Sequence, residues 1–253
     1  TMPHNAAPAR PSPMRLASTY APTPQSTHVS SAARFIASTG LPVIHWTGWP
    51  ETLERWEREG LRAGADQHAY FDAVHFSKTV RTEGWIATEY NNQSNPGGFY
   101  AVGGEETSPA FANGYTYRRL IDITDAQVSS GPHTNFPFLF NTTLVDLKTT
   151  ANGGDVTDAQ GDDIIFTASD GTTQLAHEVE KYTATTGELV AWVRVPSLAS
   201  TSTIYIYYGN SSVTTFQGNV TSNGVTGVWD SNYKAAWHLK ETGSPPATWA
   251  DST

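Results

Sequence analysis

Four aspartates stand close together in residues 153–166, GGDVTDAQGDDIIF, directly before an apolar run. Closely spaced carboxylates are typical ligands of Ca²⁺. The helix–loop–helix calcium site requires acids at alternate positions, a Gly at the sixth and a Glu at the twelfth, and this spacing does not fit it. An irregular loop would still offer Asp155, Asp158 and Asp162 as calcium ligands. The alternative is a solvated loop that leads, through Asp163, into a strand.

A second pair of acids alternates in HEVEKY, where Glu178 and Glu180 share one face of an expected strand, about 7 Å apart. Glycoside hydrolysis needs two carboxyls about 5 to 9.5 Å apart, so this spacing permits catalysis. Any strand with one solvated face gives the same pattern. His177 has no second His or Cys at a ligand spacing, and we expect it to be a packing or strand-end residue. We therefore expect no catalytic residue and no enzyme activity.

Aromatic residues are the stronger functional signal, because flat rings beside a guanidinium suit the C–H faces and hydroxyls of sugars. Strand alternation in LVAWVRV places Trp192 and Arg194 on one face, and in TIYIYY it places Tyr205 and Tyr207 on one face. These four residues are the predicted carbohydrate-binding platform. The alternative is that a neighbouring domain covers this face, or that the residues only decorate a sheet.

The opposite faces of the same two segments are apolar and are expected to face the core. They carry Leu189, Ala191, Val193 and Val195 in the first segment and Ile204, Ile206 and Tyr208 in the second. If the two strands form a hairpin, Trp192 lies across from Tyr205 or Tyr207. The alternative is that the intervening PSLASTS crosses from one sheet to another.

The elements that must position these residues are short strands. From Tyr70 onward, β-rich segments alternate with Gly, Asn, Asp and Thr, which predicts an all-β fold, an antiparallel, jelly-roll-like β-sandwich. Residues 1–45 are rich in Pro, Ala, Ser and Thr and are expected to be a disordered tail. Residues 46–69 are expected to hold one short charged helix and a linker.

Composition excludes several classes of protein. The formal charge of −9, from 24 acids and 15 bases in 253 residues, disfavours a nucleic-acid partner. The absence of cysteine excludes disulfides and thiolate metal sites. No apolar run approaches the roughly 20 residues that span a bilayer, so we expect no transmembrane segment in this chain, which we interpret as an internal fragment.

The segments YRRLIDIT, FPFLF, DIIFTASDGTTQLAHEVEKY, LVAWVRVPSLASTSTIYIYYGN and VWDSNY occur in this order from Tyr117 onward. This block resembles a bacterial and archaeal surface module, domain of unknown function 2341, and we assign it residues 112–222. The resemblance implies a β-sandwich in large exported multi-domain proteins with no established activity. Some members are found beside proton-channel components.

The flanks look like parts of a second family. Residues 70–107 are similar to the terminal segment of a concanavalin A-like, laminin-G-type jelly roll, and residues 228–253 to the opening segment of a second one. Both segments are incomplete, and Trp229, Tyr233 and Trp237 are expected to pack their junction with the sandwich. Adjacent lectin-like domains of the same chain are therefore expected partners.

These features lead to three hypotheses. The first is a non-catalytic module of a prokaryotic secreted or cell-surface protein that binds glycan or another cell-envelope polymer. The second is a structural spacer between lectin-like domains that binds no ligand. The third, which we rank last, is part of a glycoside-active enzyme. Apart from Ca²⁺ at the aspartate loop, no cofactor is expected.

Overall fold

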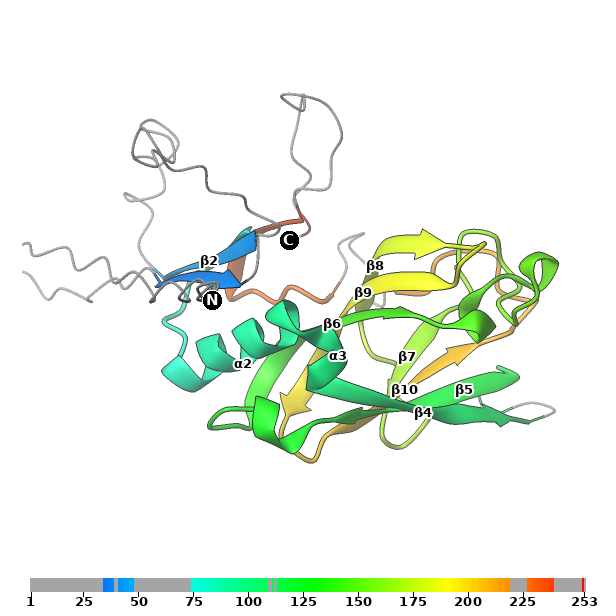
Figure 1. Ribbon diagram of the computed structural model, residues 1–253, viewed down its shortest axis with the longest axis horizontal. Coiled ribbons are helices and arrows are strands. Elements are labelled where there is room, and N and C mark those ends of the chain that lie inside the picture. Colours follow the sequence, from blue (N-terminus) through cyan, green and yellow to red (C-terminus); the bar gives the residue numbers. More distant parts are fainter. Residues whose placement is uncertain are drawn as a thin grey trace, which may run out of the picture.

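The computed structural model describes residues 34–38, 41–47, 74–108, 111, 113–218, 227–238 and 252, the first two ranges by their backbone alone (Figure 1). It confirms the predicted fold class, because the described residues form mainly antiparallel sheets in a sandwich-like arrangement. The strands are β1 (Arg34–Ser38), β2 (Leu41–Thr47), β3 (Val74–Ser77), β4 (Tyr100–Thr107), β5 (Tyr117–Ile123), β6 (His133–Thr143), β7 (Ile165–Ala168), β8 (His177–Thr183), β9 (Glu188–Leu198), β10 (Thr203–Tyr208) and β11 (Tyr233–Trp237). Helices α2 (Glu83–Ser94) and α3 (Pro96–Phe99) precede β4.

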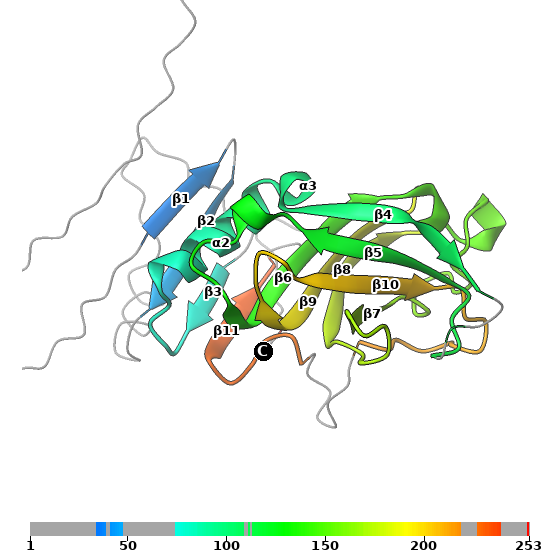
Figure 2. The ribbon, with the colours of Figure 1, turned by 90° about the horizontal axis from the view of Figure 1, so that it is seen from below.

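Within the described part of the chain, the strands form three sheets. The four-stranded sandwich sheet has the order β4-β5-β10-β7, and the three-stranded sandwich sheet has the order β6-β9-β8. The flanking sheet has the order β1-β2-β3-β11, in which β2 and β3 are parallel and the other neighbours antiparallel. Figures 1 and 2 show the flanking sheet at one end of the sandwich, with β3 beside β11.

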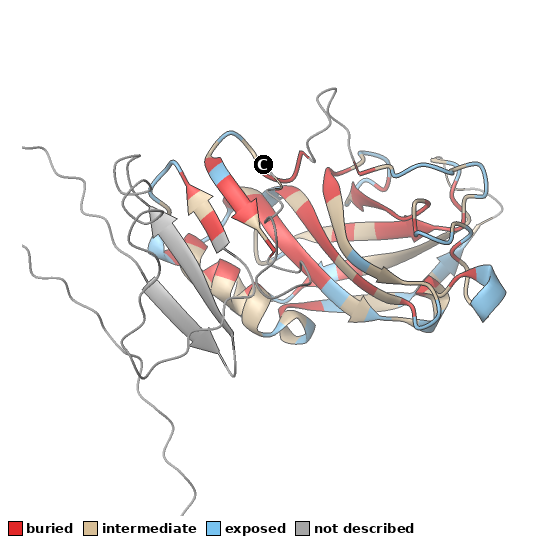
Figure 3. Cartoon of the chain, turned by 90° about the horizontal axis from the view of Figure 1, so that it is seen from above, coloured by how far each residue is buried: buried red, intermediate tan, exposed pale blue. Residues whose placement is uncertain are grey.

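The main core lies between the two sandwich sheets. The predicted core faces of β9 and β10 are confirmed, because all seven of their residues belong to this cluster. Short 3-10 turns at Asp125–Gln127, Val145–Leu147 and Thr150–Asn152 connect the strands. Figure 3 shows the buried residues running along the strands of both sheets. Period-two alternation therefore located the core of the sandwich.

Strands β9 and β10 do not form a hairpin. β9 pairs with β6 and β8 in one sheet, whereas β10 pairs with β5 and β7 in the other. The connection after Leu198 crosses between the sheets, and Leu198 is fully buried at the crossing. The Ser202 hydroxyl accepts a hydrogen bond from the Ala199 N–H at 2.8 Å and shapes the turn. The expected pairing of Trp192 with Tyr205 or Tyr207 is therefore wrong, and the crossing alternative is confirmed.

Helix α2 lies in a segment that the sequence analysis assigned to a β-rich flank. Thr82 caps it, because its hydroxyl accepts a hydrogen bond from the Trp85 N–H at 3.1 Å. Its buried residues include Trp85, Thr88, Glu89 and Asn92, a helical spacing. This stripe is mostly polar, so the usual apolar signature of an amphipathic helix is missing.

Asn92 explains how a polar helical residue comes to be buried. Its side-chain amide donates to the Leu139 carbonyl at 2.9 Å and accepts from the Leu139 N–H at 2.6 Å. The amide therefore satisfies both backbone groups of one β6 residue, as a neighbouring strand would.

Strand β4, which follows the helices, joins the four-stranded sandwich sheet although residues 70–107 were assigned to the flank.

The predicted helix at 46–69 lies outside the described residues, except for its first two positions, which end strand β2. Strands β1 and β2 fall partly within residues 1–45, the range predicted to be a disordered tail. The remainder of that range lies outside the described residues. Among the described helices, none is both long and apolar enough to cross a membrane.

Candidate functional site

The buried carboxylate of Asp163 organises the acidic loop. Its Oδ2 accepts hydrogen bonds from the Thr157 N–H (2.9 Å) and hydroxyl (2.6 Å) and from the N–H groups of Gly209 and Asn210 (both 3.2 Å). Its Oδ1 accepts from the Asp158 N–H at 3.0 Å. Asp163 is fully buried, so these donors replace its hydration. The carboxylate ties the loop to the residues that follow β10.

The three predicted calcium ligands do not converge. Asp158 Oδ1 accepts from the N–H groups of Gln160 (2.8 Å) and Asp162 (3.3 Å) and closes a turn. Burial, followed by the charges of Asp158 and Asp163, raises the pKa of Asp162. Asp155 lies elsewhere, with two acids from other loops and strands.

Among the described residues, one group of acids has a spacing that could hold a metal ion: Glu105, Asp146 and Asp155, with oxygens within 4.8 Å of one another. The Arg119 guanidinium forms an ion pair with Asp146, and the Tyr208 hydroxyl donates to Glu105 at 2.8 Å. Burial is the largest cause of the raised pKa of Glu105. Protein donors therefore already engage two of the three carboxylates, and calcium binding stays a prediction.

The predicted sugar platform is divided between opposite outer faces of the sandwich. Trp192 and Arg194 lie on the outer face of the three-stranded sheet, where Trp192 is almost fully buried in a second apolar cluster. Tyr205 and Tyr207 lie on the outer face of the four-stranded sheet, in a third cluster. The main core separates the two pairs, because sequential strands β9 and β10 entered different sheets. The four residues therefore form no common surface.

Tyr205 and Tyr207 instead accompany an arginine that the sequence analysis did not select. The Arg118 guanidinium lies 4.4 Å from the Tyr205 ring centroid and 4.6 Å from that of Phe111. Arg118 donates to Glu106 at 2.6 and 2.9 Å and to the Tyr207 hydroxyl at 3.0 Å. Phe111, Tyr205 and Arg118 are partly exposed, so they form an aromatic and cationic surface, which we call the Arg118 surface.

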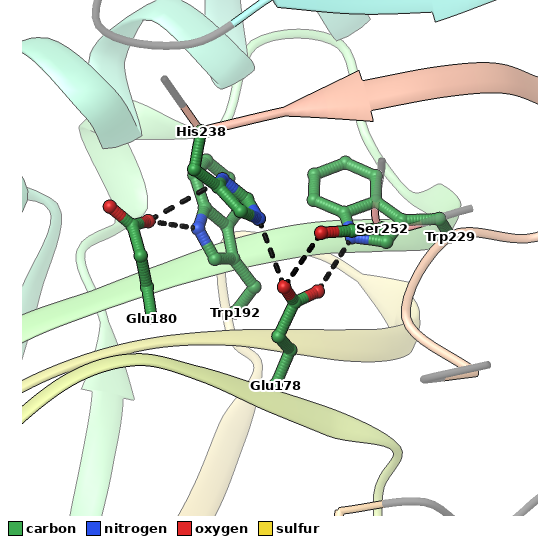
Figure 4. Close-up of polar contacts among 6 residues, drawn as sticks. All are labelled: Glu178, Glu180, Trp192, Trp229, His238 and Ser252. Atoms are coloured by element: carbon green, nitrogen blue, oxygen red, sulfur yellow. Dashed lines mark hydrogen bonds and ion pairs between the residues drawn. The ribbon is translucent and has the colours of Figure 1, made fainter. Parts of the chain in front are cut away.

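Glu178 and Glu180 point from β8 into a polar and aromatic cluster on the outer face of the three-stranded sheet (Figure 4). We call this cluster the clasp; its members are Glu178, Glu180, Trp192, Trp229, His238 and Ser252. Glu178 accepts hydrogen bonds from the Trp229 indole N–H at 3.0 Å and the Ser252 hydroxyl at 2.7 Å. Glu180 accepts from the Trp192 indole N–H at 2.8 Å. Each carboxylate thus binds an indole from a different element.

His238 lies between the two carboxylates. Its Nε2 is 3.2 Å from Glu178 and its Nδ1 is 3.4 Å from Glu180, and its ring stacks on Trp192. The Nε2 contact is a hydrogen bond, whereas Nδ1 makes no hydrogen bond with the described residues and lies only within ion-pair distance of Glu180. Burial alone would raise the pKa of Glu178, but hydrogen bonds and charge from His238, with those from Ser252 and Trp229, outweigh it and lower the pKa to about 2.

A second buried histidine extends the clasp toward helix α2. His75 on β3 is fully buried, and its Nδ1 lies 2.9 Å from Glu89 Oε1 on α2. The His75 ring is 4.6 Å from the Trp229 ring and 5.3 Å from that of Trp192. Helix, flanking sheet and sandwich therefore meet around one histidine.

Of the expected junction residues, Trp229 and Tyr233 lie in this buried cluster, whereas Trp237 contacts Phe76 on the other face of β3 and β11.

His177 is a packing residue, as predicted. It is fully buried between the rings of Phe166 and Phe216, and its Nδ1 lies 3.2 Å from the Leu175 carbonyl. Burial lowers its pKa to about 4, so the imidazole is neutral at physiological pH.

Sequence reasoning missed His75, Glu89, His238, Ser252 and Arg118. A weak local signal existed for two of them, because His75 lies within the short strand β3 and His238 directly follows β11, whose Ala235 and Ala236 are buried. Which carboxylate each histidine meets depends on contacts across 14 residues for His75 with Glu89 and 60 residues for His238 with Glu178. No local pattern carries that information.

Residues 160–237 match the model of a family described as a domain of unknown function, DUF2341. The matched region runs from the acidic loop to the end of β11 and includes both clasp carboxylates and both clasp tryptophans. Neither the curated proteins nor the solved structures give a match to this chain. The matched region includes residues 228–237 of the second flank, and the concanavalin A-like assignment of residues 70–107 and 228–253 stays a prediction.

Proposed function

We propose that this chain is a non-catalytic structural module of a secreted or cell-surface prokaryotic protein, in which the sandwich holds neighbouring β-structure in a fixed position. The observation that carries this proposal is the clasp. Glu178 of β8 and Trp192 of β9 contact Trp229, which precedes β11, and His238, which follows it; Glu178 also binds Ser252. A surface that bound an external ligand would have to release these contacts first.

The engagement of Glu178 and Glu180 also supports a non-catalytic role. A glycosidase requires one protonated carboxyl as its general acid, usually with a raised pKa. Glu178 has a pKa lowered to about 2, so it is ionised at neutral pH. Its oxygens face Trp229, Ser252 and His238, which would hinder protonation of a leaving group. The secreted, prokaryotic location rests on the family resemblance.

The substitution Glu178→Gln tests this role. The amide removes the charge that faces His238, so we expect the backbone amides of β11 to exchange with deuterium about tenfold faster, equivalent to about 1.4 kcal/mol. The amides of β10, in the other sheet, should keep their wild-type rates. The measurement is native-state hydrogen exchange, resolved by peptide.

Acidification should reproduce this effect in the wild type. Because the folded pKa of Glu178 is depressed from 4.5 to about 2, its stabilisation is complete above pH 4.5 and is lost as the pH falls toward 2. β11 in Glu178→Gln should lack this component of the pH dependence. Glu188→Gln is the matched control, since Glu188 pairs with the exposed Lys181 instead. Equal effects of both substitutions on β11 would contradict the proposal.

Glycan binding is the second candidate function, and the Arg118 surface is the observation that favours it. Partly exposed rings of Phe111 and Tyr205 lie against a guanidinium, with the half-exposed carboxylate of Glu106 beside it. Rings of this kind pack on the C–H face of a sugar while the charged groups bind its hydroxyls. This surface retains one residue of the predicted platform, Tyr205, whereas Tyr207 is buried beside it and accepts a hydrogen bond from Arg118.

The substitution Tyr205→Ala tests glycan binding. We expect it to weaken retention on a panel of immobilised cell-wall polysaccharides at least tenfold, or by about 1.4 kcal/mol, without a change in melting temperature. Phe216→Ala is the control, because Phe216 is an exposed ring outside the Arg118 surface. If the wild type binds no polysaccharide, or both variants lose retention equally, this second function is excluded for this surface.

A further inference from the structure

The two connections between the sandwich and the flanking sheet lie side by side. The chain leaves β3 after Ser77 and enters β11 at Tyr233, and these two residues face each other in the sheet. Immediately beyond them, the Lys78 N–H donates a hydrogen bond to the Asn232 carbonyl at 2.6 Å. The whole sandwich, residues 78–232, is therefore joined to the flanking sheet at two hydrogen-bonded neighbours.

The other ends of the same strands are also adjacent. β3 and β11 are antiparallel, so the start of β3, at Val74, lies opposite the end of β11, at Trp237. Upstream strands β1 and β2 continue the sheet on the β3 side. Downstream, the Ser252 N–H donates to the Ala236 carbonyl on β11 at 2.9 Å. Chain from before and after the sandwich thus enters one sheet.

The β3–β11 pair has apolar residues on both faces. Tyr233 and Ala236 face the sandwich and belong to its second apolar cluster. The opposite face carries Phe76 and Trp237, whose ring centroids are 5.4 Å apart, together with the buried Ala235. Strands that are apolar on both faces are typical of a sheet covered on both sides. The β3–β11 pair therefore has the pattern of strands that belong to a sheet covered on both sides.

We propose that the sandwich is an insertion between two adjacent strands of one β-domain, and that β1, β2, β3 and β11 belong to that domain. This differs from the expectation that residues 70–107 and 228–253 belong to two separate jelly rolls. Insertions are tolerated where the ends of the inserted unit lie close together, as Lys78 and Asn232 do. The inference deepens the proposed structural role, since the clasp then fixes an inserted domain against its host.

Engineered disulfides test the pairing, and the natural absence of cysteine makes the result unambiguous. Phe76 and Ala235 lie opposite each other, and opposed residues of antiparallel strands have Cα atoms about 4.5–5.5 Å apart, within the range of about 4.4–6.8 Å that a disulfide spans. In the full 253-residue chain, we expect Phe76→Cys/Ala235→Cys to form an intramolecular disulfide under mild oxidation. Non-reducing electrophoresis and peptide mass mapping provide the measurement.

Two kinds of control are needed. The single-cysteine variants can form only intermolecular dimers. In Phe76→Cys/Lys234→Cys, the second residue has no partner in the β3–β11 register. The last pair should cross-link in much lower yield. A second pair, Val74→Cys/Trp237→Cys, tests the same register if Ala235→Cys unfolds the chain. Cross-links between chains, or none in either designed pair of a folded protein, would overturn the insertion.

These outcomes are distinguishable from failure of the clasp. β3 and β11 are joined through their backbones, so the disulfide does not require Glu178. We expect Phe76→Cys/Ala235→Cys to cross-link equally well when combined with Glu178→Gln. If Glu178→Gln does not change hydrogen exchange in β11 but the disulfide still forms, the insertion is supported. In that case only the proposed role of the clasp in fixing the inserted domain is contradicted.

Discussion

Asp163→Asn is expected to lower the free energy of unfolding by about 3–5 kcal/mol, because it disrupts a buried charged network. Asp163 has no exposed surface and accepts five hydrogen bonds, from Thr157, Asp158, Gly209 and Asn210. An amide retains one acceptor oxygen, so at least one donor faces an NH₂ group instead. Urea denaturation followed by circular dichroism measures the change.

Asp162→Asn is the matched control for this prediction. Asp162 adjoins Asp163, but burial and the charges of Asp158 and Asp163 raise its pKa, so its ionised form is disfavoured in the fold. Removing its charge should leave stability unchanged or raise it slightly. If Asp162→Asn destabilises the protein as much as Asp163→Asn, the loss of any aspartate charge in the loop lowers stability. The prediction that Asp163 stabilises the fold through its own buried hydrogen bonds is then wrong.

Trp192→Ala is expected to lower the free energy of unfolding by a similar amount, about 3–5 kcal/mol, since it leaves a cavity in a packed cluster. The Trp192 ring lies within about 5.5 Å of the rings of His75, Trp229 and His238, and its indole N–H donates to Glu180. The loss should also speed hydrogen exchange in β11. Thermal and urea denaturation, with exchange resolved by peptide, provide the measurements.

Two substitutions separate packing from hydrogen bonding at this position. Trp192→Phe keeps much of the ring volume but removes the donor to Glu180, so it should cost less than Trp192→Ala. Trp237→Ala removes a tryptophan from the opposite face of β11 and should leave the clasp intact. A stable Trp192→Ala variant that had lost polysaccharide retention would return Trp192 to the role of an exposed sugar platform.

The candidate site could be predicted only in part, and the carboxylates show why. The residue types at 153–166 predicted either calcium ligands or a solvated loop, whereas Asp163 is fully buried and accepts hydrogen bonds from backbone N–H groups. The donors at Gly209 and Asn210 come from the end of a strand more than forty residues away. Asp155 meets Glu105 and Asp146 for the same reason, through the pairing of β4 with β5 and the course of the loops.

The sequence by itself determined the fold class and the core faces of β9 and β10. Alternation in a strand is a property of the backbone, since successive side chains point to opposite sides whatever the strand pairs with. A stripe such as Leu189, Ala191, Val193 and Val195 must therefore be buried on one side of its sheet. The same argument shows that Trp192 points the other way, but it does not show what lies there.

Only the tertiary structure decided which faces meet. Strand pairing is a contact between distant segments, and the crossing after Leu198 sent β9 and β10 to different sheets. That placement separated Trp192 from Tyr205 and Tyr207, covered Trp192 with β3 and β11, and paired Tyr205 with Arg118. Side-chain alternation has a period of two residues, whereas a tertiary contact such as that of Ser77 with Asn232 joins residues 155 positions apart, so local pattern fixes a side chain's face but not its partner.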